Sequence, residues 1–226
     1  MSIPLYFAAE CKAFTTASPQ LLKAFTGFGI YNDGSPRIPS MAGLAKGLVV
    51  IDDQTLPQVE VPENTFETLI TYCKAGCFFD FMQAPTQAHS AIIQGFLPLL
   101  GKESLVLVAE TYGQQFLNCI PVISCPFPLN HWERFIRQCG KLYPSGWCLE
   151  LIPWAWKMNT SLNTQKSEEY LENVMCLTKH TGGIIQYYDT AETLLSRLHL
   201  AENYGCRYAI GLYHELTELG INYIEK

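Results

Sequence analysis

The sequence predicts an α/β fold, a compact eight-stranded (β/α)8 barrel that occupies residues 1–226 as a single domain. Three observations lead to this prediction. Short apolar runs rich in Val, Ile, Phe and Tyr recur along the chain, separated by stretches with helical periodicity. Several of these runs lack polar alternation, which is typical of parallel strands covered on both faces. The composition agrees, because 48% of the residues are hydrophobic and only 16% are charged, against roughly 25% in average soluble domains.

The predicted strands are short and spread over the whole chain. They are Ile3–Ala9, Leu48–Asp52, Cys77–Phe81, Leu105–Ala109, Ile120–Ser124, Trp147–Ile152, Ile184–Tyr187 and Tyr208–Tyr213. Strands that alternate with helices predict a parallel sheet with right-handed crossovers.

Periodicity and polarity predict the segments between the strands. We expect helices over residues 64–74, 86–100, 130–139, 167–178 and 190–204, and loops over 32–47 and 157–166. Thr86 and Asn130 are suitable residues to cap two of these helices. Barrels of this kind usually need about 250 residues, so some helices are expected to be short or missing. The segment between Glu110 and Cys119 is one such place.

Charge and motifs exclude several classes of function. The net charge is −6 and Lys and Arg do not cluster, so we expect no nucleic-acid partner. Apolar runs are too short to span a bilayer and the N-terminus does not read as a signal peptide, which predicts a cytoplasmic protein without a membrane partner. The Cys73–Cys77 spacing lacks a second ligand pair, and Gly27-Phe28-Gly29 lacks a third glycine. We therefore expect no metal and no cofactor. The oligomeric state is not determined by the sequence.

One predicted strand contains an acidic residue in an apolar setting. Residues 75–82 read AGCFFDFM, and alternation along a strand places Phe78, Asp80 and Met82 on one face. Burying a carboxylate is costly unless it has partners. Asp80 is therefore a candidate site residue.

The same segment resembles the fourth barrel strand of the family-18 glycoside hydrolases, the chitinase-like barrels, whose motif is D-G-x-D-x-D-x-E. Gly76 and Asp80 match the motif. Ala75 and Phe78 stand at its first two acidic positions, and Met82 stands at the position of the glutamate.

A second resemblance lies near the C-terminus. Residues 188–193 (YDTAET) precede a predicted helix, and residues 209–216 (AIGLYHEL) follow it. The arrangement is similar to the closing pattern of the family, in which a Tyr-Asp turn starts the last helix and the last strand ends near Trp-Glu-Leu. In this alignment Leu105–Glu110 and Trp147–Trp156 correspond to the fifth and seventh strands.

The resemblance implies a fold and also an altered chemistry. In the family, the motif glutamate is the general acid, and a neighbouring aspartate positions the N-acetyl group that attacks the anomeric carbon. A thioether cannot donate a proton, so Met82 implies that the usual mechanism is not available. Gln83 is adjacent, but an amide is not an acid either.

Other carboxylates are candidates because active sites of this fold lie at the C-terminal ends of the strands. Asp80, Glu110 and Glu150 are the catalytic candidates, as an Asp80/Glu110 or Glu110/Glu150 acid–base pair. Asp52 and Glu215 are candidates for ligand binding, and Glu10 and Asp53 also follow strands. Each of these residues alone is equally consistent with a salt bridge or a helix cap.

Aromatic residues near the strand ends favour a carbohydrate or a related small ligand, because flat rings suit the apolar C–H faces of sugars. The candidate ligand contacts are Tyr112, Trp154, Trp156 and Tyr213. Single rings are also common in cores. Among the histidines, only His214 lies at a strand end; the others are expected to have surface or packing roles.

Two functional hypotheses remain. The first is a chitinase-like barrel that binds a sugar or related ligand at its C-terminal mouth, or hydrolyses it with relocated carboxylates. The second is a non-catalytic structural or interaction protein whose mouth is closed by its own aromatic residues.

Overall fold

The predicted fold class is confirmed: eight parallel strands close into a barrel in this computed structural model, which describes residues 3–161 and 167–222. The strands follow one another in chain order around the barrel. They are β1 (Leu5–Ala9), β2 (Leu22–Ile30), β4 (Leu48–Asp52), β5 (Gly76–Asp80), β6 (Leu105–Ala109), β7 (Ile120–Ile123), β8 (Trp147–Leu151) and β13 (Cys206–Leu212).

The number of barrel strands was predicted correctly, but one member was wrong. Residues 184–188 form a strand outside the barrel, and the second barrel strand is β2, which the sequence did not reveal. Two glycines interrupt β2, and Gly27 has a φ of +93° where the pairing with β4 is irregular. Glycine weakens a strand pattern and often marks a bulge. The GFG segment is therefore part of a bulged strand and not a nucleotide-binding turn.

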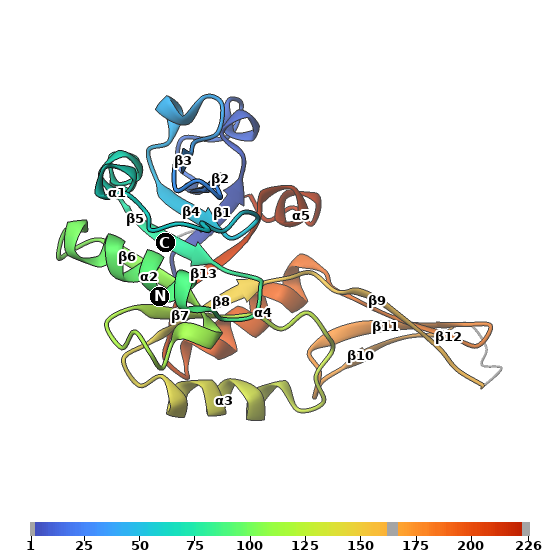
Figure 1. Ribbon diagram of the computed structural model, residues 1–226. Helices are drawn as coiled ribbons and strands as arrows, with labels where there is room; N and C mark the ends of the chain where they lie inside the picture. Colours follow the sequence, from blue (N-terminus) through green and yellow to red (C-terminus); the bar gives the residue numbers. More distant parts are fainter. Residues whose placement is uncertain (1–2, 162–166, 223–226) are drawn as a thin grey trace. The chain divides into compact units, whose positions relative to one another are not determined.

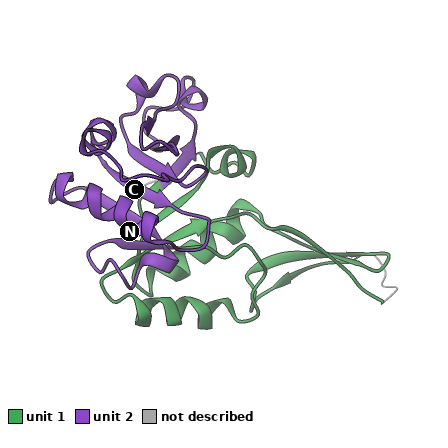
Figure 2. Cartoon of the chain, in the orientation of Figure 1, with its two compact units in different colours: residues 1–5, 123–226 green, residues 6–122 purple. Residues whose placement is uncertain are grey.

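The chain divides into two compact units, residues 6–122 and residues 1–5 with 123–226 (Figure 2). The first unit contains the helices α1 (Glu63–Ile70) and α2 (Gln87–Phe96) (Figure 1). Short 3-10 turns also occur in this unit: η1 (Cys11–Phe14), η2 (Ala42–Leu44), η3 (Leu97–Leu99), which continues α2, and η4 (Glu110–Tyr112). The last of these confirms the prediction of a short connection after β6. A two-residue strand, β3 (Pro36–Arg37), lies within the predicted loop 32–47 and pairs antiparallel with β2.

The face of β5 that carries Cys77 and Phe79 packs against the helices. The Phe79 ring lies 5.3 Å from Phe96 of α2, edge to face. Phe78 and Asp80 therefore occupy the opposite face, toward the barrel axis. Gly76 opens the strand with a φ of +123°, and a Cβ atom there would lie 1.9 Å from the carbonyl oxygen of Leu105. Only glycine fits this position, which explains why the motif glycine is retained.

The second unit contains the helices α3 (Trp132–Leu142), α4 (Ala191–Glu202) and α5 (Tyr213–Glu218). Between β8 and α4 the chain forms a four-stranded antiparallel sheet, in the spatial order β10, β11, β12, β9 (Figure 1). Its strands are β9 (Ala155–Asn159), β10 (Ser167–Leu171), β11 (Cys176–Thr181) and β12 (Ile184–Tyr188).

This sheet overturns two predictions. The helix expected over 167–178 is two strands with a turn, and the loop expected over 157–166 begins as strand β9; residues 162–166 lie outside the described residues. The residues of β10 are nearly all exposed, so they carry no buried alternation that would mark a strand. Pairing with β11 decides their conformation. The cap of α3 was also misplaced, because the N-cap is His131 and not Asn130.

Among the described residues, no helix combines the length and apolar character needed to cross a membrane. No group of three or more His, Cys, Asp or Glu side chains in this part of the chain is arranged to hold a metal ion. The nine cysteines are free and buried, and burial raises the pKa of the Cys119 thiol to about 11.

Candidate functional site

The residue at the position of the family's general acid is exposed. Met82 follows β5 and 84% of its side-chain area is accessible. Asp80, at the end of β5, is partly buried and lies in register with Asp52 of the neighbouring strand β4. The two carboxylates therefore belong to adjacent strand ends, as the sequence predicted from their positions.

The backbone after β5 is fixed by a buried carboxylate. Asp53 accepts hydrogen bonds from the backbone N–H groups of Met82 (3.1 Å) and Gln83 (2.8 Å). His89 of α2 lies 3.2 Å from the same carboxylate through its Nε2 atom. The Nδ1 atom of His89 accepts the backbone N–H of Thr86 at 3.0 Å, so Nε2 carries the proton and donates it to Asp53.

Asp53 and His89 therefore position the loop that contains Met82. His89 is fully buried, and the sequence did not indicate its link with Asp53. The capping box at Thr86 gave a signal, because His89 occupies the third position of the helix and completes that box. The predicted Thr86 cap is confirmed.

Asp52 has partners of its own. Arg37 forms an ion pair with it, and the backbone N–H of Gln54 donates to it at 3.0 Å. Arg37 also donates to the side chain of Gln54 at 2.8 Å and to the carbonyl of Phe28 at 3.2 Å. The Asp52 carboxylate is thus engaged in a network that secures the ends of β2, β3 and β4.

Glu110 and Tyr112 lie in η4, directly after β6. Partial burial of its carboxyl group raises the pKa of Glu110. Tyr112 is almost completely buried and its ring packs edge to face on Phe81 at 5.8 Å. Burial raises the pKa of Tyr112, and the negative charge of Asp53 adds to the effect. Glu110 is accessible to a ligand, whereas Tyr112 is part of the core.

Glu150 of β8 is directed toward the barrel axis. The indole N–H of Trp147 donates to the carbonyl of Tyr204, just after α4, at 3.1 Å, so that face of β8 packs on the helices. Side chains alternate along a strand, which places Cys148 and Glu150 on the other face. Ser124, after β7, donates a hydrogen bond to the Glu150 carboxylate.

A second carboxylate influences Glu150. Burial is the main cause that raises the pKa of Glu150; the hydrogen bond from Ser124 lowers it and the negative charge of Glu215 raises it further. Glu150 lies opposite Ile210 of β13, and Glu215 is in the first turn of α5, which follows β13 directly. The structure thus brings together two of the predicted residues, Glu150 and Glu215, a pair that the sequence did not single out.

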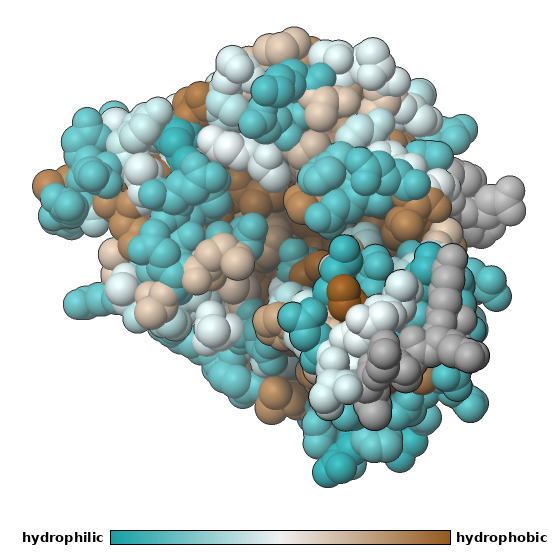
Figure 3. Space-filling view, turned by 90° about the vertical axis from the view of Figure 1, so that its right-hand side faces the viewer, coloured by the Kyte–Doolittle hydropathy of each residue, from teal (hydrophilic) through white to brown (hydrophobic). Residues whose placement is uncertain are grey.

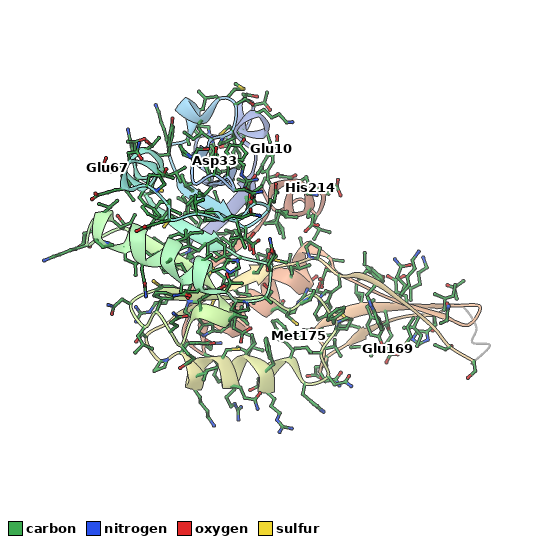
Figure 4. All side chains as sticks on the ribbon, in the orientation of Figure 1. Glu10, Asp33, Glu67, Glu169, Met175 and His214 are labelled. Atoms are coloured by element: carbon green, nitrogen blue, oxygen red, sulfur yellow. The ribbon has the colours of Figure 1, made fainter. Side chains whose placement is uncertain are left out.

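The other residues of α5 and the end of β1 are more open. Tyr213 is half-buried and begins α5, and His214 is exposed on the same helix (Figure 4). Glu10, also labelled there, is exposed and forms an ion pair of 2.8 Å with Lys12.

The two predicted tryptophans have different environments. Trp154 is 3% exposed, and its ring lies 3.8 Å from the guanidinium of Arg197. Its backbone N–H donates to Asp189 at 2.8 Å, and Asp189 forms a buried ion pair with Arg197. Trp156 of β9 is 39% exposed and its ring packs against Tyr187. Trp154 therefore anchors the start of the four-stranded antiparallel sheet (the inserted sheet, β9 to β12), whereas the side chain of Trp156 is accessible to solvent.

No family model and no curated protein sequence matches this chain. Solved structures do. The spore cortex-lytic enzyme SleL of Bacillus cereus has a TM-score of 0.64 and 12% identity, over 98% of this chain and 74% of that chain. A GH18 chitinase from Cycas revoluta in complex with (GlcNAc)3 has a TM-score of 0.63 and 8% identity, over 98% of each chain.

A further similar structure is human YKL-39, described as a pseudo-chitinase with retained chitooligosaccharide binding properties. Its TM-score is 0.60 with 6% identity, over 93% of this chain and 92% of that chain. Identities this low report on the fold alone. The chain therefore has the barrel fold of the family-18 chitinases and pseudo-chitinases, as the resemblance of its sequence implied.

Proposed function

We propose that this chain is a carbohydrate-binding, chitinase-like barrel that does not use the family's general acid. The proposal rests on one observation: the chain has the barrel fold of the chitinases, but Met82 stands where the acid would be and exposes a thioether. A thioether neither donates nor accepts a proton in the pH range of enzymes. The likeness to YKL-39, a pseudo-chitinase with retained chitooligosaccharide binding properties, supports the same view.

We place the ligand at the C-terminal ends of the barrel strands. In the second unit, Glu150 and Glu215 supply the polar contacts. In the first unit, the polar residues at the strand ends are Asp80, in register with Asp52, and the exposed Glu110. Trp156 and Tyr213 supply accessible aromatic surface. Tyr112 and Trp154 are buried, so we do not propose them as direct ligand contacts.

A second candidate is hydrolysis with a relocated acid. Glu150 favours it, because its carboxyl group faces the barrel axis beside a second carboxylate and its pKa is raised. Glycosidases use two carboxyl groups, one of which acts as an acid with a raised pKa. In this scheme Glu150 donates the proton to the leaving oxygen, and Glu215 of the same unit is the partner carboxylate.

The alternative of a non-catalytic interaction protein stays open to test. It is favoured by the engagement of Asp52 with Arg37 and of Asp53 with His89, since carboxylates in ion pairs are less available to a ligand.

Thermal unfolding in the presence of ligands tests the proposal. We would measure the melting temperature of the wild type with chito-oligosaccharides, other neutral oligosaccharides and small metabolites, and repeat it with Asp80→Ala and Glu150→Gln. A ligand that binds the native state raises the melting temperature. The matched control is Glu103→Gln, an exposed glutamate before β6, which should keep the wild-type shift.

A sugar-induced shift that disappears in Asp80→Ala or Glu150→Gln supports the site. Release of reducing sugar that is lost in Glu150→Gln supports hydrolysis. No shift with any sugar contradicts the carbohydrate proposal and favours the interaction protein.

A further inference from the structure

The second unit has a groove outside the barrel mouth. Its volume is about 1000 Å³, and it is lined by α3, the turn between β10 and β11, and α4. Ligand sites typically have volumes of about 300–1000 Å³. Figure 4 shows Met175 at this turn, beside α3. All of the lining residues belong to one compact unit.

Two residues that line the groove have a strained backbone. His131 has a φ of +65° and Met175 a φ of +56°. Residues other than glycine rarely adopt a positive φ, because this backbone conformation costs them about 1–2 kcal/mol. The two strained segments are joined, because the backbone N–H of Trp132 donates to the carbonyl of Asn173 at 2.8 Å. The strain is therefore concentrated where the turn meets the helix.

One wall of the groove carries charged groups that are paired with one another. Arg137 donates to Glu133 at 2.9 Å on the same helix, and the hydroxyl of Tyr204 donates to Glu133 at 2.7 Å. The hydrogen bonds from Tyr204 and Arg137 lower the pKa of Glu133. These groups are already paired, so they present fixed donors and acceptors rather than a free charge.

The remaining lining combines balanced charge with an aromatic ring. Arg134 and Arg137 are matched by Glu133 and Glu172, so the groove does not select strongly for an ion. Arg134 is exposed and makes no ion pair with another described residue. Tyr170 of β10 exposes 45% of its area. A guanidinium fork, an amide and carboxylates next to a flat ring suit a ligand with many hydroxyl groups and apolar C–H faces.

We propose that this groove is a second carbohydrate-binding site for a neutral oligosaccharide, with Tyr170 as the platform and Arg134 as the main donor. The inference rests on the proposed function, since both sites would take the same class of ligand. It adds a separate site on α3 and the inserted sheet. Figure 3 shows hydrophilic and hydrophobic residues interspersed on the face toward which this sheet projects.

Isothermal titration calorimetry with chitohexaose, cellohexaose and maltohexaose tests the site. The variants are Tyr170→Ala and Arg134→Ala in the groove, Glu150→Gln at the mouth, and Lys141→Ala as a control on the exposed end of α3, outside the groove. Tyr170 and Arg134 are exposed, so their removal should not unfold the chain. We expect the wild type to bind two equivalents of one hexasaccharide, and each groove variant to lose one equivalent or bind it at least about tenfold more weakly.

The number of sugar equivalents that each variant binds distinguishes the proposed groove site from the proposed site at the barrel mouth. Loss of one equivalent in Tyr170→Ala and in Arg134→Ala, with both equivalents kept in Lys141→Ala, supports the groove. Glu150→Gln should lose the other equivalent, and it does so only when the mouth also binds the sugar. Loss only in Glu150→Gln supports the mouth and overturns the groove. Loss only in the groove variants, from a wild type that binds one equivalent, supports the groove and overturns the mouth. A wild type that binds none of the three sugars overturns both.

Discussion

Asp53 and Met82 are joined by a hydrogen bond of 3.1 Å from the backbone N–H of Met82 to a carboxylate oxygen of Asp53. The position that bears the acid in the chitinase-like family thus lies in a loop whose backbone is fixed by Asp53, a buried residue directly after the preceding barrel strand β4. The side chain of Met82 is free of this restraint and points into solvent. The backbone of this loop is therefore fixed without any contribution from the side chain at position 82.

Asp53→Ala should lower the free energy of unfolding by about 3 kcal/mol, because two backbone N–H groups and His89 lose a buried acceptor. Asp53→Asn should have a smaller effect, since an amide oxygen still accepts one of these bonds. Urea unfolding measures both. Asp33→Ala is the control: Asp33 is exposed (Figure 4), and its carboxylate accepts hydrogen bonds from the backbone N–H and the hydroxyl of Ser35. Equal effects at Asp53 and Asp33 would contradict the structural role of Asp53.

Glu150→Gln should change the pH dependence of stability. Burial and Glu215 raise the pKa of Glu150 above its ordinary value of 4.5, so the folded state binds the proton more tightly than the unfolded chain. Stability contributed by the protonated form is present below 4.5 and is lost as the pH rises through the folded-state pKa. In Glu150→Gln this fall in stability with rising pH is absent, because the glutamine side chain does not ionise.

Melting temperatures measured from about pH 4 to about pH 8 test the expectation. The gain in stability of Glu150→Gln over the wild type should grow as the pH rises. Glu103→Gln should follow the wild-type profile. If the two variants show the same profile, the carboxyl group of Glu150 is not perturbed in the folded protein.

Arg197→Met should destabilise the second unit by about 3–5 kcal/mol, because it leaves the buried carboxylate of Asp189 without its counter-charge. It also removes the cation that stacks on Trp154. The double variant Arg197→Met with Asp189→Asn should recover part of the loss. Urea unfolding followed by tryptophan fluorescence measures both, and a single variant as stable as the wild type would contradict the anchoring role of this pair.

His131→Gly should raise the free energy of unfolding by about 1 kcal/mol, because glycine adopts a positive φ without strain and also serves as an N-cap. Gly205→Ala is the opposite test. Gly205 has a φ of +88°, and a Cβ atom there would meet only Trp147, at 3.9 Å. Gly205→Ala should therefore lower the free energy of unfolding by about 1–2 kcal/mol, from backbone strain alone. A destabilised His131→Gly would show that the imidazole makes a favourable interaction at the groove.

The barrel could be predicted because most of its strands are apolar and continuous. Leu48–Asp52 and Leu105–Ala109 were predicted with their observed bounds, since a parallel strand covered on both faces leaves a clear run in the sequence. The helices α2 and α4 were visible from their periodicity, and the cap of α2 was predicted at Thr86.

The elements that were missed or misjudged lack such a local signal. Strand β2 is broken by glycines that serve a bulge, and the strands β9 and β10 are exposed along their length. Their conformation is set by hydrogen bonds to neighbouring strands, which no local pattern records.

The sequence by itself determined the barrel, the replacement of the motif glutamate by Met82, and the acidic residues at the strand ends. Only the tertiary structure decided what each of those residues does. It joined Asp52 to Arg37 and Asp53 to His89, buried Trp154 beneath Arg197, and placed Glu215 where its charge acts on Glu150. The physical reason is that burial, ion pairing and pKa depend on residues distant along the chain, whereas strand and helix patterns depend on near neighbours.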